Sequence, residues 1–202
     1  MIMADRVLNC IIALLTLLLV ISFFRKDKKW VPERGKGALR FFTTQSNILV
    51  AVAALLTDLA LTAGGTIPRW IWTLKYIGTA AVTVTMLTVL LFLAPSFGKG
   101  ALKMLLSGTD LFMHLITPLM ALFSFCVFER QGMTFCESLW GLLPVVLYGP
   151  LYLYKILFAL PEKRWEDFYG FNKQGKWPVA FACMVAGTFV ICMALMAVQN
   201  VH

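Results

Sequence analysis

The chain has 202 residues, of which 60% are hydrophobic and only 14% are charged, and its mean hydropathy is +0.81. Soluble domains carry about 25% charged residues, so this composition excludes a soluble globular domain and a disordered chain. The formal net charge of +8 comes from cations in a few loops. This pattern is typical of a membrane protein and argues against nucleic acid as a partner.

The hydrophobic residues are arranged in six blocks, each close to the length of about 20 residues that crosses a bilayer. The blocks cover approximately residues 7–24, 46–63, 72–94, 105–128, 139–160 and 178–198. Their residues do not alternate between apolar and polar, as they would in a β-barrel, so all six are predicted to be helices. We therefore expect an all-α fold, in which a single membrane domain forms a six-helix bundle.

The distribution of Lys and Arg predicts the orientation of this bundle. Fourteen of the 18 lie in or beside the first, third and fifth loops, including Lys99 and Lys103 in the third loop. The positive-inside rule places these three loops in the cytoplasm and both termini outside, in a plasma or inner membrane.

The fifth loop combines its cations with aromatic residues, which are Trp165, Phe168, Tyr169, Phe171 and Trp177. Aromatic rings favour the headgroup region of a bilayer, so this loop is expected to lie along the membrane surface. It serves either as a plain interfacial anchor or as a lid over a site that faces the lipid.

The five cysteines form no CxxC pair and no cluster with histidine, so no metal site is predicted. Cys126 and Cys136 flank the fourth loop. The sequence leaves open whether these two form a disulfide or pack as small apolar residues.

Ionisable residues inside a span are costly and need partners. Asp58 lies late in the second block and Lys75 lies early in the third, so both are near the same end of a predicted antiparallel hairpin. We expect them to form a structural ion pair.

His114 and Asp110 lie four residues apart in the fourth block, so their side chains share one face of the predicted helix. A neutral imidazole buried in a membrane needs a partner, and Asp110 is placed to orient it. The alternative is a polar contact that only locks two helices together.

A run of five uncharged polar residues opens the second block: Thr43, Thr44, Gln45, Ser46 and Asn47. Helix capping needs only one or two such residues. Because the second and fourth helices enter the membrane from the same side, Thr43 and His114 are expected to meet inside the bundle. At 1.5 Å per residue, His114 would lie about 10 Å deeper than Thr43 unless the second helix begins before Thr43 or the fourth begins after Gly108.

The two motifs resemble those of the androgen-induced-gene and androgen-dependent TFPI-regulating protein family and its bacterial relatives. The resemblance rests on Phe42-Thr43-Thr44-Gln45-Ser46-Asn47 and on His114-Leu115-Ile116-Thr117-Pro118. Members of that family have six spans, and the animal members are described as threonine hydrolases of fatty acid esters of hydroxy fatty acids. The resemblance implies that Thr43, or its neighbour Thr44, is the nucleophile and that His114 is the general base. The spacing from His114 to Pro118 is one residue shorter than in the animal proteins.

The residues suit such a reaction without a metal or an organic cofactor. His114 would accept the Thr43 proton, and Asp110 would fix the tautomer of the imidazole. Donors to the developing oxyanion are expected among three neighbours, which are Gln45, Ser46 and Asn47. The expected partners are membrane lipids or fatty acid esters.

The sequence leaves two other functions open. The chain would be a transporter or small-ligand binder if its intramembrane polar residues form a pathway, and Pro144 and Pro150 do interrupt the fifth block. The pathway residues would be Asp58, Lys75, Asp110 and His114. It would be a structural or regulatory subunit if Thr43 and His114 only cap and pack helices.

Overall fold

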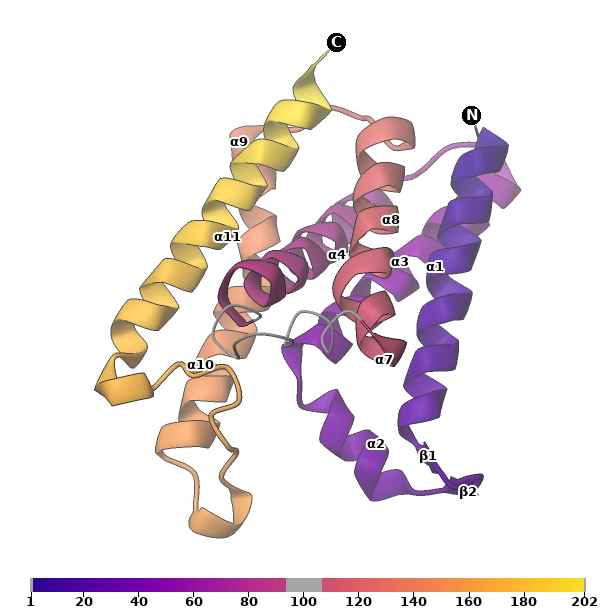
Figure 1. Ribbon diagram of the computed structural model, residues 1–202. Coiled ribbons are helices and arrows are strands. Elements are labelled where there is room, and N and C mark those ends of the chain that lie inside the picture. The colour runs from indigo at the N-terminus through magenta and orange to yellow at the C-terminus, as the bar shows by residue number, and fades with distance from the viewer. Residues whose placement is uncertain (1, 94–106, 202) are drawn as a thin grey trace.

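Within residues 2–93 and 107–201, which the computed structural model describes, six helices are long and apolar enough to cross a membrane (Figure 1). They are Ile2–Phe23, Phe42–Gly64, Arg69–Leu93, Gly108–Phe128, Phe135–Leu157 and Trp177–Asn200. The all-α fold class and the six predicted helices are confirmed. The third loop with Lys99 and Lys103, and the block ends predicted at 94 and 105, lie outside the described residues.

Three of the six spans are a single regular helix, and three contain irregular turns. The regular spans are α1 (Ile2–Phe23), α3 (Phe42–Gly64) and α11 (Trp177–Asn200). The third span consists of α4 (Arg69–Thr88) and the π-helical turn η1 (Val89–Leu93). The fourth span consists of α7 (Gly108–Leu111), the π-helical turn η2 (Phe112–Ile116), α8 (Thr117–Phe123) and the π-helical turn η3 (Ser124–Phe128). The fifth span consists of α9 (Phe135–Ser138), the 3-10 turn η4 (Leu139–Leu142) and α10 (Leu143–Leu157).

The helix ends follow the signals in the sequence. Gly65 ends α3 in the left-handed conformation, with φ of 69°, and its N–H donates to the Leu61 carbonyl. Glycine adopts this conformation without steric cost. At the start of α11, Pro178 lies in the first turn, where its missing N–H breaks no helical hydrogen bond.

Helix α4 runs through the centre of the bundle and is the most buried of the six described spans (Figure 1). It packs closely against α3 at Gly78, where an added Cβ atom would lie 2.8 Å from the Val50 Cα atom. Small residues at such crossings let two helix backbones approach. Both termini lie at one end of the bundle, which we call the terminal end.

The first loop is folded rather than extended. Strands β1 (Arg25–Lys26) and β2 (Lys29–Trp30) pair around Asp27 and Lys28, which have φ of 49° and 63°. Two successive positive φ values match the turn that suits the twist of a hairpin. The short helix α2 (Pro32–Leu39) follows, and this segment lies at the end of the bundle opposite the termini (Figure 1).

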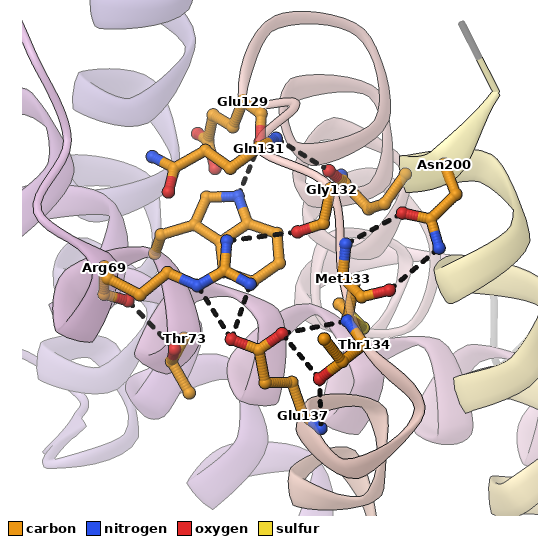
Figure 2. Close-up of polar contacts among 11 residues, drawn as sticks. Arg69, Thr73, Glu129, Gln131, Gly132, Met133, Thr134, Glu137 and Asn200 are labelled. Atoms are coloured by element: carbon orange, nitrogen blue, oxygen red, sulfur yellow. Dashed lines mark hydrogen bonds and ion pairs between the residues drawn. The ribbon is translucent and has the colours of Figure 1, made fainter.

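The fourth loop is fixed by polar contacts to two helices (Figure 2). Arg69 Nη2 lies 2.6 Å from Glu137 Oε1, and this ion pair joins α4 to α9. The Asn200 side chain accepts from the Met133 N–H and donates to the Met133 carbonyl, both at 2.8 Å, which joins the loop to α11. These contacts close the terminal end of the bundle.

The two cysteines beside this loop are not joined. Cys126 is half-buried, Cys136 is exposed, and both are free thiols. The disulfide that the sequence left open is therefore absent from this structure, in which the loop is held by side-chain hydrogen bonds and an ion pair.

Replacing Gly78 by Ala should lower the melting temperature of the detergent-solubilised protein. Alanine normally favours a helix over glycine, but here its Cβ atom would overlap α3, and overpacking costs about 1–3 kcal/mol. Gly64→Ala is the matched control, because a Cβ atom there meets nothing within 4 Å. Equal melting temperatures for the two variants would contradict the close packing of α3 on α4.

Candidate functional site

Thr43 lies in the wall of a small, mostly apolar cavity of about 40 Å³. Helix α3 begins at Phe42 rather than near Ser46, so Thr43 is part of its first turn. This start satisfies one of the two conditions under which Thr43 and His114 were expected to meet. Around Thr43 the cavity is lined by Val84 and Thr88 of α4, Tyr148 of α10 and Met184 of α11.

The fifth loop covers this cavity. Tyr169 and Phe171 of the loop line it, and the Tyr169 hydroxyl accepts a hydrogen bond of 3.0 Å from the Phe42 N–H. The loop is held on α10 because the Tyr152 hydroxyl donates to Asp167 at 2.8 Å and accepts from the Tyr169 N–H at 3.2 Å. Of the two roles expected for the loop, these contacts fit a cover over the Thr43 cavity.

Tyr169 places a second hydroxyl beside that of Thr43. The Tyr169 hydroxyl interacts with the Thr43 and Tyr148 side chains as well as with the Phe42 N–H. Burial raises the pKa of the Tyr169 phenol above its ordinary value, and these hydrogen bonds offset only part of that rise. Tyr169 is therefore a protonated donor at neutral pH. The sequence pattern missed this residue because its aromatic neighbours indicated only a membrane interface.

The polar side chains that follow Thr43 donate hydrogen bonds to backbone carbonyl groups. Asn47 Nδ2 donates to the Thr43 carbonyl at 2.8 Å, and Ser46 Oγ donates to the same carbonyl at 3.0 Å. Gln45 is exposed and donates to the Leu39 carbonyl at 3.0 Å. The described residues that line the Thr43 cavity include none of these three expected oxyanion donors. Thr44 is buried.

His114 lies in a widened turn of the fourth span. In η2 the Thr117 N–H donates to the Phe112 carbonyl, five residues back, instead of four. The cause is Pro118, which has no N–H to offer the His114 carbonyl and whose ring crowds that carbonyl. Such π-helical turns are frequent at functional sites.

Asn47 joins the Thr43 segment to the His114 segment. Its Nδ2 group also donates to the Met113 carbonyl at 3.0 Å, and that carbonyl belongs to the peptide bond that leads into His114. The half-buried His114 is not among the described residues that line the Thr43 cavity. The two segments therefore meet at Asn47, whereas a contact between Thr43 and His114 themselves stays a prediction.

Asp110 differs from its predicted setting. It lies in the short helix α7, and its side chain is exposed. A triad carboxylate is buried beside its histidine, so this exposure does not suit the predicted role. The π-helical turn begins two residues after Asp110, so the four residues from Asp110 to His114 do not form one regular α-helical turn.

A second polar cluster lies near the terminal end, and Lys75 is at its centre. Lys75 and Glu129 are both fully buried, and their Nζ and Oε1 atoms are 2.8 Å apart. The Lys75 ammonium also donates to the Asn9 amide oxygen. Ser124 Oγ lies 2.6 Å from Glu129 Oε1 and 2.8 Å from Asp5 Oδ1, so a second carboxyl group joins the cluster.

The predicted pair of Asp58 and Lys75 is wrong. Asp58 instead accepts from Arg6 Nε of α1 at 3.1 Å, at a partly exposed position. Lys75 faces α1 and the end of the fourth span, where Asn9 and Glu129 lie. The sequence argument considered only charges within blocks and so omitted Glu129, which follows the end of its span by one residue.

No family model, curated protein or solved structure matches the chain.

The buried ion pair can be tested by neutralisation. Lys75→Met alone should destabilise the protein by about 3–5 kcal/mol, because Glu129 stays buried without its counter-ion. Lys75→Met combined with Glu129→Gln should cost less than the sum of the single changes, as measured by unfolding in detergent.

Asp58→Asn is the matched control for that cycle. Asp58 shares no partner with Lys75, so its effect should add to that of Lys75→Met within about 0.5 kcal/mol. The pairing of Lys75 with Glu129 would be contradicted if the stability losses of Lys75→Met and Glu129→Gln simply added, while those of Lys75→Met and Asp58→Asn did not.

Proposed function

We propose that the chain is an intramembrane hydrolase of lipid or fatty acid esters, with Thr43 as the nucleophile and His114 as the general base. One observation carries the proposal: Thr43 and Tyr169 line the same mostly apolar cavity, and their side chains interact there. A mostly apolar cavity with a few polar groups at one point suits a ligand that has an apolar part and one polar bond.

The proposed reaction begins when Thr43 Oγ1 attacks the ester carbonyl carbon and passes its proton to His114. The carbonyl oxygen becomes an oxyanion, which accepts a hydrogen bond from the Tyr169 hydroxyl. Collapse of this intermediate breaks the ester C–O bond, and the leaving alcohol takes the proton from His114. Water then attacks the acyl-threonine, again with His114 as the base, and releases the fatty acid.

Asn47 supports this scheme as a positioning residue. Its two hydrogen bonds fix the Thr43 carbonyl relative to the Met113 carbonyl, and so fix the first turn of α3 relative to the His114 segment. The base must reach the Thr43 proton directly or through one water, and apo sites are often looser than the reacting complex.

A second candidate function is binding of a lipid or small ligand without catalysis. The exposure of Asp110 favours it, because the carboxylate of a catalytic triad is buried. Under this proposal the cavity holds the same apolar ligand, and Thr43 and Tyr169 only recognise its polar group. A transport pathway finds less support, because Lys75 and Glu129 are paired with each other.

The orientation belongs to the same proposal. We infer that the first, third and fifth loops face the cytoplasm because they carry most of the cations. The Thr43 cavity, which the fifth loop covers, then opens near the cytoplasmic leaflet, and the Lys75 cluster lies toward the outer side.

Thr43→Ala should abolish ester hydrolysis and labelling by a fluorophosphonate probe, while Thr44→Ala, the matched control, should keep both. His114→Ala should remove activity to the same extent, and the Thr43/His114 double variant should be no worse, since the two act as a unit. Tyr169→Phe should lower kcat about 10²–10³-fold, the usual cost of one oxyanion donor.

Two outcomes of this series would change the proposal. Activity retained by Thr43→Ala but lost by Thr44→Ala would move the nucleophile by one position. Activity retained by both threonine variants and by His114→Ala would overturn hydrolysis and leave the binding function.

Orientation can be measured by cysteine labelling in intact cells. In a variant that keeps Cys136 alone, this exposed thiol should react with a membrane-impermeant maleimide from outside. With Lys173→Cys as the single cysteine, reaction should require permeabilised cells. The reverse pattern would place the Thr43 cavity at the outer leaflet.

A further inference from the structure

A second apolar cavity, of about 500 Å³, lies between the third span and α11. Five of its lining residues also line the cavity of Thr43: Val84, Thr88, Tyr169, Phe171 and Met184. The two cavities are therefore neighbours with a common wall of α4, α11 and the fifth loop. Together they extend from Thr43 toward the lipid-facing surface of the bundle.

The lining of the second cavity suits hydrocarbon rather than water. The described residues that line it include no charged side chain. The Thr188 hydroxyl is used within its own helix, where it donates to the Met184 carbonyl at 2.8 Å. Water needs several polar partners to occupy a buried space, whereas an apolar chain needs none.

Helix α11 contacts its neighbours on both sides of this cavity but leaves a gap between those contacts. Toward the terminal end, Cys192 and Leu195 pack into the core with Trp72 of α4. Toward the other end, Phe181 lies against Gly149 of α10, where an added Cβ atom would be 2.3 Å from the ring.

Gly187 lies between these two contacts and lines the cavity. A Cβ atom added there would meet nothing within 4 Å. Across the cavity, in η1, Leu91 and Phe92 are exposed by 61% and 67%. Both helices are spans, so this opening faces the hydrocarbon of the bilayer sideways rather than water.

We propose that the second cavity binds one acyl chain of a lipid, which enters from the bilayer between the third span and α11, with the polar end of the chain at Thr43 and Tyr169. The location of the ester at Thr43 rests on the proposed function. Binding of the chain between the two spans does not, and it can be measured without hydrolysis.

The test uses a fatty acid that carries a photoreactive diazirine near its methyl end, added to the unaltered protein in lipid nanodiscs. Because a free fatty acid has no ester bond to hydrolyse, the readout is binding alone. After irradiation, mass spectrometry should find the cross-link on residues 183–191 of α11 or residues 87–93 of the third span.

Gly187→Leu should lower this cross-linking about tenfold, equivalent to about 1.4 kcal/mol, because its side chain fills the cavity. Gly187→Ala, which the open space accommodates without distortion, should have a smaller effect of the same sign. Gly64→Leu is the matched control, since Gly64 also has open space but lies at the far end of α3, and it should leave the cross-link unchanged.

The outcomes separate this inference from the proposed function. The acyl-chain site would be overturned if two results were found together. The cross-links would be spread equally over lipid-facing positions of other helices, such as Leu17 and Leu18 of α1, and Gly187→Leu would not change them. That pattern would indicate only surrounding lipid. Specific cross-linking at α11 in a protein that hydrolyses no ester would support the site while contradicting hydrolysis.

Discussion

A charged or polar side chain inside a membrane has to find its partners within the protein, because lipid offers none. Lys75 imposes this constraint most strongly, since it lies fully buried in the central helix α4. Its ammonium needs a counter-charge, and Glu129 supplies it only if the end of the fourth span packs against α4. Asn9 brings α1 to the same point. Three spans are thus joined by hydrogen bonds near the terminal end. Removing either Lys75 or Glu129 would leave the other as an unpaired buried charge, which costs far more stability than the loss of one surface ion pair.

The opposite end of the bundle has a different character. There the hydroxyl groups of Thr43, Tyr148 and Tyr169 gather at the edge of an apolar cavity, and the neighbouring polar side chains fix the backbone. The terminal end is thus held by buried polar contacts, whereas the opposite end contains a cavity covered by the fifth loop. Phe42, bonded to Tyr169, is the contact through which the loop and the first turn of α3 would move together.

The sequence predicted the six helices well, because a hydrophobic block of span length has few alternatives in a membrane. The block limits at 63 and 178 fall within one residue of the end of α3 and the start of α11, where Gly65 and Pro178 fix the local backbone geometry. Polar partners were harder to predict, because they depend on how helices rotate and pack. Lys75 was assigned to the wrong carboxylate for this reason, and Asp110 to a buried role that a regular helix would have allowed. Tyr169 could not have been found from spacing, since it meets Phe42 across 127 positions of the chain.

In the proposed reaction, Thr43 forms a covalent bond to the acyl group of a lipid ester. The most direct measurement is peptide mass spectrometry of the protein quenched in acid during turnover of a slowly hydrolysed fatty acyl ester. The account predicts an added acyl mass on the peptide that contains Thr43, located to that residue by fragmentation and absent when His114 is replaced by Ala. An acyl group found on another residue, or sustained hydrolysis by a protein that never carries an acyl group, would contradict it.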